Sequence, residues 1–284
     1  MQIELKNVNF IYDENAAMSL TALKDINLKI ERGVFYALIG HTGSGKSTLI
    51  QLFNGLLRPT SGEVLADDVP IGDKSMNMKS LRSRVGLVFQ YPEHQLFETT
   101  VYEDVAFGPK NLKLSKDEID ARVREALTLT GMDESLWQES PFELSGGQKR
   151  RVAIAGVLAM KPEILILDEP TAGLDPRGRD EILGVLKSLH ADEGLTIVLV
   201  SHSMEDVAGC AERIIVMNKG TVAYNDVPSV IFSHPEELRQ MGLNVPQVTA
   251  VTSGLKAAGW PLPDGITTVA EAADEIVRVL KGKN

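Results

Sequence analysis

A glycine-rich segment, GHTGSGKS, has the composition of a phosphate-binding loop. It spans residues 40–47 and follows an apolar run. Gly40, four further residues and then Gly45-Lys46-Ser47 match the spacing of the phosphate loop found in nucleotide-binding proteins. Glycines let backbone N–H groups turn toward phosphate oxygens, and a helix that begins here adds a favourable dipole. We expect Lys46 to reach the β and γ phosphates and Ser47 to bind Mg²⁺.

The other residues of this loop are candidates through their backbone groups or their hydroxyls. The complete set expected to bind a nucleotide is Tyr12, Gly40, Thr42, Gly43, Ser44, Gly45, Lys46, Ser47 and Thr48. The ring of Tyr12 could stack on a base, because aromatic faces stack on bases well. As an isolated tyrosine it could equally be a core or surface residue.

Two carboxylates follow a second apolar run, ILILDEP, at residues 164–170. Asp168 is placed to hold magnesium through water, as the strand-end aspartate of phosphate-loop enzymes does. Glu169 lies one residue further and is placed to orient and activate an attacking water. Without the phosphate loop, the same pair before Pro170 could simply cap a turn. The loop favours the catalytic interpretation.

Two further polar residues end apolar runs and have both a chemical and a structural interpretation. Gln90 follows VGLVF and could coordinate the metal or the attacking water, although a lone glutamine there is ordinarily solvated. His202 follows IVLVS and could contact the γ phosphate, although a single histidine is more often a packing residue. Both catalytic assignments therefore depend on the other motifs.

A second glycine-containing segment, ELSGGQKRRVAIAGVLAM, spans residues 143–160. Ser145 is a favourable residue for the start of a helix, and Gly146 and Gly147 leave backbone N–H groups bare. This predicts a second helix N-terminus that can bind an anion. A single bound nucleotide needs only one such anion-binding helix N-terminus, so the second one requires an explanation.

These candidate residues follow short, apolar segments of the chain. Runs at 34–40, 85–90, 164–169 and 196–202 are continuously apolar up to a polar or glycine end, a pattern typical of parallel strands buried on both faces. Open α/β sheets bind ligands at the carboxyl ends of their strands, so we expect Gly40, Gln90, Asp168, Glu169 and His202 to converge. Alternation in DINLKI, at 25–30, predicts a half-exposed strand and an antiparallel edge sheet.

Helical patterns fill the remaining chain. Ser115 and Glu118 form a predicted capping box, followed by apolar residues at helical spacing, which predicts an inserted helical subdomain at about 91–160. A hairpin turn at 218–220 closes the main domain. Beyond it, Pro246 opens a helix carrying Val248, Val251 and Leu255, and a helix capped by Thr268 and Glu271 follows. We therefore divide the chain into a domain at 1–230 and a helical appendage at 231–284.

Composition excludes several classes of protein. The chain has 284 residues, a formal net charge of −10 and one cysteine, Cys210. The negative charge argues against a generic nucleic-acid binder, and one cysteine excludes an internal disulfide framework and is expected in the core. Met1 is followed by the polar pattern QIELKN, so we expect no secretion signal. The apolar runs are shorter than the roughly 20 residues of a membrane-spanning helix.

Taken together, the phosphate loop, Gln90, LSGGQ, ILILDE, GLD at 173–175 and His202 resemble the ATPase subunit of an ABC transporter over about residues 1–230. The resemblance implies an α/β phosphate-loop NTPase fold with a mixed central sheet, an antiparallel edge sheet, an inserted helical subdomain and a small C-terminal helical appendage. It also implies that ATP and Mg²⁺ are bound, the metal by Ser47, Gln90 and, through water, Asp168. Hydrolysis would be carried by Glu169, His202 and Gln90.

The same resemblance explains the second anion-binding helix. In the head-to-tail dimer of this family, the LSGGQ of one chain closes over the ATP held by the phosphate loop of the other. The residues expected to act on the partner's ATP are Leu144, Ser145, Gly146, Gly147 and Gln148. Asp175 would lie at the dimer seam.

A narrower resemblance concerns FQYPEHQLFETTVYEDVAFGPKNL at 89–112, SGGQKRRVAIAGVLAM and the tail LNVPQVTAVTSGLKAAGWPLP. These segments resemble energy-coupling factor ATPases, which drive uptake of vitamins and transition-metal ions, and YPEHQLFE resembles the second of two paralogous subunits. The implied partners are a paralogous ATPase (or self), a transmembrane scaffold and small substrate-binding membrane proteins, at the cytoplasmic face of the membrane. Leu96 and Phe97 would lie near the groove for the scaffold's coupling helices, or belong to the subdomain core. The tail helices would add dimer contacts.

Three alternatives remain open from the sequence. A homodimeric ATPase of a cobalt, nickel or other conventional importer shares much of the tail. A soluble mechanochemical ABC ATPase acting on nucleic acid or ribosomes fits poorly with the acidic charge, the single cassette and the lack of a long heptad insertion. An ATP-gated scaffold without turnover would not require Glu169 and His202.

Overall fold

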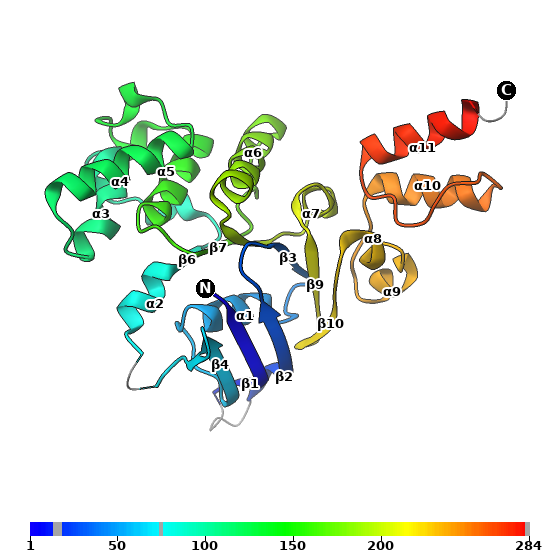
Figure 1. Ribbon diagram of the computed structural model, residues 1–284, viewed down its shortest axis with the longest axis horizontal. Helices are drawn as coiled ribbons and strands as arrows, with labels where there is room; N and C mark the ends of the chain where they lie inside the picture. Colours follow the sequence, from blue (N-terminus) through cyan, green and yellow to red (C-terminus); the bar gives the residue numbers. More distant parts are fainter. Residues whose placement is uncertain (14–18, 74–75, 282–284) are drawn as a thin grey trace.

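The computed structural model describes residues 1–13, 19–73 and 76–281, and the strands of these residues form two sheets (Figure 1). The antiparallel sheet has the order β2-β1-β4-β5, and the larger sheet has the order β10-β9-β3-β8-β7-β6. The strands are β1 (Ile3–Tyr12), β2 (Leu20–Ile30), β3 (Phe35–Gly40), β4 (Ser61–Ala66), β5 (Val69–Pro70), β6 (Val85–Val88), β7 (Ile164–Asp168), β8 (Thr196–Val200), β9 (Arg213–Asn218) and β10 (Thr221–Asp226).

The antiparallel sheet has the predicted alternation. In β2, Ile26, Leu28 and Ile30 are buried, while Asn27 and Lys29 are exposed. Side chains of a strand point alternately to opposite faces, so one face of this sheet packs on the core and the other meets solvent. The predicted half-exposed strand and antiparallel edge sheet are confirmed.

In the larger sheet, the four continuously apolar runs pair in parallel as β3, β8, β7 and β6. Strand β9 also runs parallel to β3, while β10 returns antiparallel to β9 through the predicted hairpin. The sheet is therefore mixed. Together with the antiparallel sheet and the covering helices, it confirms the predicted α/β fold class.

Each parallel strand is buried on two faces. In β7, Ile164 and Ile166 pack toward the antiparallel sheet and α1, whereas Leu165 and Leu167 pack against the helical side. The helices are α1 (Lys46–Phe53), α2 (Met78–Arg84), α3 (Val101–Asn111), α4 (Lys116–Leu129), α5 (Gly146–Leu158), α6 (Pro176–Glu193), α7 (Met204–Cys210), α8 (Pro228–Ile231), α9 (Pro235–Gln240), α10 (Gln247–Ala257) and α11 (Val269–Lys281). Burial on both faces explains why these strands have no polar alternation.

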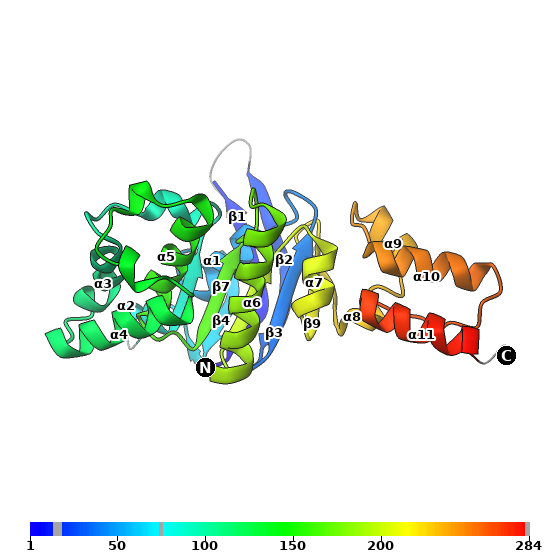
Figure 2. The ribbon, with the colours of Figure 1, turned by 90° about the horizontal axis from the view of Figure 1, so that it is seen from above.

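Helices α3, α4 and α5 lie together beside the β6 edge of the sheet (Figures 1 and 2). Helix α4 begins as predicted, because the Ser115 hydroxyl accepts a hydrogen bond from the Glu118 N–H at 3.3 Å. The Glu118 carboxylate instead accepts a hydrogen bond from Arg122 at 2.7 Å, on the surface of the same helix. Of the two hydrogen bonds of the predicted capping box, the one accepted by the Ser115 hydroxyl is therefore present.

The segment after residue 226 has two parts. Helices α8 and α9 pack on the main sheet, where Ile231, Phe232 and Leu238 share a core with Ala37 and Ile39 of β3. Helices α10 and α11 lie beside each other at one end of the molecule (Figure 2).

The buried face of α10 differs from the apolar pattern of the sequence. Thr249 and Thr252 are buried, and their hydroxyls donate to backbone carbonyls, whereas Val251 is 59% exposed. Val269, Val277 and Leu280 of α11 are exposed as well. The tail therefore presents apolar side chains outward. Among the described residues, the helices lack the combination of length and apolarity needed to cross a bilayer.

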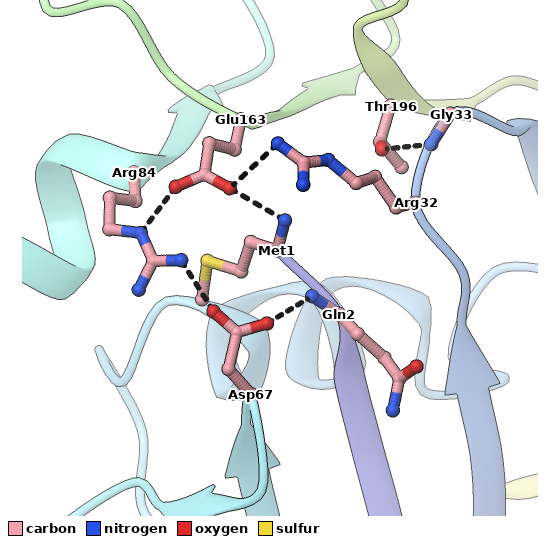
Figure 3. Close-up of polar contacts among 8 residues, drawn as sticks. All are labelled: Met1, Gln2, Arg32, Gly33, Asp67, Arg84, Glu163 and Thr196. Atoms are coloured by element: carbon pink, nitrogen blue, oxygen red, sulfur yellow. Dashed lines mark hydrogen bonds and ion pairs between the residues drawn. The ribbon is translucent and has the colours of Figure 1, made fainter.

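A charged network joins the two sheets near the amino ends of β1 and β7 (Figure 3). Glu163, just before β7, accepts from the amino group of Met1 at 2.6 Å and from Arg84 at 2.5 Å. Arg84 also pairs with Asp67 of the β4–β5 turn, and Arg32 lies 3.7 Å from Glu163. These contacts link the first strand to the strand that carries Asp168.

Candidate active site

A cavity of about 490 Å³ lies at the carboxyl ends of the parallel strands. It is lined by Tyr12, Leu20, Thr21, Ala22, Thr42, Gly43, Gly45, Lys46, Ser47, Thr48, Gln90, Asp168, Glu169 and His202. The predicted convergence of residues from separate strand ends is therefore present. Gly40 and Ser44 are the two predicted nucleotide contacts that do not line it; Ser44 is fully buried behind the loop.

The shape of the loop depends on close backbone approaches. Gly45 has a φ of 103°, and a Cβ at this position would lie 2.6 Å from the carbonyl oxygen of Ala22. An L-residue is strained by both the conformation and this contact, so glycine is required. Helix α1 begins at the next residue, Lys46, which places the helix N-terminus in the cavity wall.

Lys46 is the cation of the cavity. Its Nζ donates to the carbonyl oxygens of Gly40 at 2.6 Å and His41 at 3.3 Å, and the residue is 7% exposed. Burial lowers the pKa of Lys46, while the nearby carboxylates of Glu169 and Asp168 oppose that shift. A buried ammonium held by carbonyl groups of its own loop is well prepared to exchange them for phosphate oxygens.

Glu169 follows β7 in a left-handed conformation, with a φ of 52°. Its N–H donates to Val200 O at 3.0 Å, and its own carbonyl accepts from the Ala172 N–H at 3.1 Å. The first bond continues the β7–β8 ladder one residue beyond the strand and places Glu169 opposite the end of β8. His202 lies there, with Nε2 3.2 Å from Glu169 Oε1.

The Glu169 carboxylate is poised for proton transfer. Oε1 is buried and lacks a hydrogen-bond partner within the described residues, because the contact with His202 has the distance of an ion pair without hydrogen-bond geometry. Burial and then the neighbouring Asp168 raise the pKa of Glu169 to about 7. Burial and Lys46 lower the pKa of His202. A carboxyl group with a pKa near neutrality can accept a proton and release it again.

The donor set for a metal fits Mg²⁺. Ser47, Gln90 and Asp168 line the same cavity and offer a hydroxyl, an amide oxygen and a carboxylate. Magnesium is commonly held by one or two carboxylates, with waters and substrate phosphates completing its shell. Burial raises the pKa of Asp168 and Lys46 opposes this, so a divalent cation nearby would favour the charged carboxylate.

Tyr12 lies at the rim of the cavity. Its hydroxyl hydrogen-bonds with Thr48 Oγ1 at 3.0 Å, and its ring packs edge-to-face on Phe10 with centroids 4.7 Å apart. The side chain is 38% exposed. One side of the ring is therefore supported by the protein, and stacking on adenine stays a prediction.

The LSGGQ segment has the predicted local structure but lies outside this cavity. The Ser145 hydroxyl accepts from the Gln148 N–H at 3.3 Å, and the Gln148 side chain accepts from the Ser145 N–H at 2.9 Å, a complete capping box. Leu144 is buried, whereas Ser145 and Gly146 are exposed at the start of α5. Asp175 likewise caps α6, accepting from the Gly178 N–H at 2.7 Å.

A larger groove of about 590 Å³ lies on the helical side, between α2, α3 and α5. Phe97 is 57% exposed there and packs edge-to-face on Phe107. Leu96 also lines the groove but is 8% exposed and belongs to the subdomain core. Leu96 therefore fits the core interpretation, and the binding of coupling helices near Phe97 stays a prediction.

Sequence reasoning missed two parts of the site. Leu20, Thr21 and Ala22 line the cavity at the start of β2, and an ordinary polar-apolar strand pattern gives no sign of this role. The ion pair of Glu93 with Arg150 was missed as well, since nothing in the run Lys149-Arg150-Arg151 indicates which cation is buried.

Comparisons with known proteins define the family of the chain. The sequence pattern that defines the ABC transporter family matches residues 23–172. The chain belongs to the ABC transporter family, as one of its ATP-binding subunits. It is 53% identical over its full length to the energy-coupling factor transporter ATP-binding protein EcfA2 of Clostridium tetani (strain Massachusetts / E88), covering 99% of that protein. It is 52% identical to EcfA2 of Caldanaerobacter subterraneus subsp. tengcongensis, covering 99% of both chains.

Solved structures show the same fold. CbiO1 of Clostridium perfringens, part of the ABC transporter complex CbiONQ, matches with a TM-score of 0.75 and 42% identity over 88% of this chain and 98% of its own. A dimeric ATP-binding cassette in a post-hydrolysis state with ADP and phosphate matches with a TM-score of 0.69 and 34% identity, over 79% of this chain and 98% of its own. Within the family, this chain is an energy-coupling factor transporter ATPase that binds and hydrolyses ATP.

Proposed function

We propose that Glu169 is the general base of ATP hydrolysis and that the chain powers an importer of vitamins or transition-metal ions. Glu169 accepts a proton as the water oxygen forms its bond to the γ phosphorus and the bond to the ADP oxygen breaks. Its buried carboxylate, 3.2 Å from His202 and in the same cavity as Lys46, is the observation that carries this proposal.

The other side chains of the cavity act on charge. Lys46 neutralises the β and γ phosphate oxygens, and His202 contacts the γ phosphate on the side of the attacking water. Ser47, Gln90 and Asp168 would hold Mg²⁺, the aspartate through water, and the ion would offset the charge of the phosphates. Tyr12 stacks on adenine, with its ring held by Phe10 and Thr48. Gly40 and Ser44 shape the loop from behind.

The catalytic unit is a head-to-tail dimer. Ser145, Gly146 and Gly147 begin a well-capped helix whose exposed N-terminus is suited to an anion, yet they do not line the cavity of their own chain. In the dimer, Leu144 to Gln148 close over the ATP of a paralogous ATPase subunit, and Asp175 lies at the seam. The exposed apolar residues of α10 and α11 add contacts between the subunits.

Work is delivered through the groove on the helical side. We assign it to the coupling helices of a transmembrane scaffold, with Phe97 and Phe107 as apolar contacts. Small substrate-binding membrane proteins complete the importer, and the ATPase lies at the cytoplasmic face of the membrane. The choice of cargo belongs to those membrane components.

Replacing the proposed base tests the chemistry. The variant Glu169→Gln should bind ATP as the wild type does but lose about 10²–10⁴-fold in turnover, because binding uses Lys46 and backbone donors. Steady-state phosphate release and equilibrium ATP binding are measured side by side in the assembled complex.

The matched control is Glu125→Gln, on the surface of α4, where Glu125 pairs with Lys161. It should hydrolyse ATP normally. Near-normal turnover in Glu169→Gln would show that another group is the base.

A further inference from the structure

Arg150 of α5 is a charged side chain placed in the interior. It is 2% exposed, and its side chain is among the largest fully buried ones of the described residues. Burying a cation is unfavourable unless it is paired and its N–H groups are hydrogen-bonded. The identity of its partners therefore indicates what the arginine does.

The partners lie in two directions. On one side, Nη2 donates to Glu93 Oε1 at 2.9 Å and to Oε2 at 3.1 Å, with Nε 3.3 Å from Oε2. On the other side, Nη1 donates to the carbonyl oxygens of Pro170 at 2.8 Å and Ala172 at 2.7 Å. A planar guanidinium can make such a forked set, whereas a lysine ammonium of the same charge cannot.

Each partner belongs to a segment of the active site. Glu93 lies in the 3₁₀ turn Pro92–Gln95, three residues after Gln90. Pro170 and Ala172 follow Glu169, whose left-handed backbone is closed by the Ala172 N–H. Arg150 itself lies one turn after the Ser145 cap. One side chain thus joins the segment of Gln90, the turn of Glu169 and the helix that begins at LSGGQ.

The turn at 170–172 is also held by a contact with α7. The Thr171 hydroxyl donates to Asp206 of α7 at 3.1 Å, and Asp206 in turn pairs with Arg179. Residues with unfavourable backbone conformations keep them only where the surroundings determine them. With α7 fixed, the Arg150 contacts decide where the turn lies relative to α5.

We propose that Arg150 is a positioning residue that fixes the Glu169 turn and the Gln90 segment relative to α5, so that the rate of hydrolysis depends on it while ATP affinity does not. Its effect is transmitted through the carbonyls of Pro170 and Ala172 and through Glu93. The inference rests on the proposed role of Glu169 as the base.

The test is Arg150→Lys in the full-length chain within its assembled transporter. Lysine keeps the positive charge but cannot make the forked set of hydrogen bonds to Glu93, Pro170 and Ala172. The Glu169 turn should therefore shift, while the contacts of Lys46 with phosphate remain. A misplaced catalytic group costs on the order of 10²-fold in rate, and we expect kcat per ATP-binding site to fall by about 10- to 100-fold with the ATP Kd changed less than about twofold. The matched control is Arg151→Lys, where Arg151 pairs with Glu181 at 3.4 Å and lies outside these contacts; it should leave kcat unchanged.

A second variant answers the case in which Arg150→Lys does not fold. Glu93→Gln leaves the carbonyl contacts of Arg150 in place and removes the anionic partner, so it should lower kcat less than the lysine variant with the same unchanged Kd. If both fold, the double variant should lose less than the product of the two single losses, since the two residues share one network.

The outcomes separate this inference from the proposed function. Normal kcat per site in Arg150→Lys, or in Glu93→Gln where the first does not fold, with changes confined to melting temperature, would mean that the pair is structural. If Glu169→Gln is inactive in the same assay, only this inference fails. If Glu169→Gln is active, the proposed base fails first.

Discussion

At the scale of single residues, the cavity combines side chains of opposite charge, Lys46 and Glu169. Lys46 is buried against carbonyl oxygens, and the Oε1 atom of Glu169 is buried without a hydrogen bond from the described residues. An unpaired buried acceptor is unfavourable unless water or a ligand satisfies it. In the proposed mechanism, a water would satisfy Glu169, and phosphate oxygens would replace the carbonyl oxygens that Lys46 contacts now.

A residue-scale prediction concerns Gly147, the second residue of α5. A Cβ there meets no atom within 4 Å in the part of the chain that the structure describes. Gly147→Ala should therefore leave the isolated chain as stable as before, or more stable by up to about 0.5–1 kcal/mol. If this surface closes over a partner's ATP, the added methyl should still lower turnover in the complex by at least about tenfold.

Denaturation of the chain and ATP turnover of the complex are measured on the same variants. Gly184→Ala is the control, because Gly184 lies in α6 with equal space around its Cβ. It should change stability in the same direction and leave turnover alone. Unchanged turnover in Gly147→Ala would speak against LSGGQ acting on a partner's nucleotide.

Part of the cavity was predictable from the sequence, because some of its residues end an apolar run or lie in a spaced motif. Lys46, Asp168, Glu169 and His202 are of this kind. Arg150 carries no such signal, because Lys149-Arg150-Arg151 contains two arginines. One of them is buried, and the other forms a surface ion pair with Glu181. Which face of α5 turns inward depends on how it packs against residues distant in sequence, and a single sequence does not encode that directly.

At the scale of elements, the apolar pattern predicted strands more reliably than tail helices. Strands buried on two faces need apolar residues at nearly every position, so β3, β6, β7 and β8 could be predicted from the sequence. In α10, Thr249 and Thr252 turn inward because their hydroxyls bond to backbone carbonyls, and Val251 is left outside. Of the apolar residues that the spacing predicted to pack, Val251 is therefore exposed, while Val248 and Leu255 are partly buried.

An element-scale prediction concerns Arg84, which joins the end of α2 to β4 and to the residue before β7 (Figure 3). Its hydrogen bond lowers the pKa of Glu163. Burial raises the pKa of Asp67, but hydrogen bonds from Arg84 and the Gln2 N–H outweigh this and lower it. A carboxyl whose folded pKa is depressed stabilises the fold above its unfolded pKa and loses that contribution as pH falls through the folded value.

The ordinary values of these groups are 4.5 and 3.8, so the loss should begin below about pH 4.5. Since these side chains are partly exposed, Arg84→Gln should cost about 1 kcal/mol of unfolding free energy at pH 7 and less at pH 3. Urea denaturation at both pH values measures this. Arg278→Gln, which removes a surface pair with Glu275, should have a smaller effect. An Arg84→Gln cost that is equal at both pH values would contradict the assignment.

At the scale of the whole molecule, the two anion-binding helix starts do not meet within one chain. Helix α1 begins at the cavity, whereas the start of α5 lies outside it, and the groove with Phe97 lies on the helical side. The tail adds exposed apolar side chains at the other end (Figure 2). These separate surfaces are best explained if other proteins cover them, which a single chain's sequence suggests only through its family.

The proposed function requires this ATPase to work with a paralogous subunit on a membrane importer. Gentle purification of the chain from its native membrane, with identification of its companions by mass spectrometry, tests this requirement. We predict a paralogous ATPase, a transmembrane scaffold and one or more small membrane proteins in stable association. Recovery of this chain with ribosomes or nucleic acid, and without membrane proteins, would contradict the claim; recovery with only copies of itself and a conventional permease would contradict the paralogous partner.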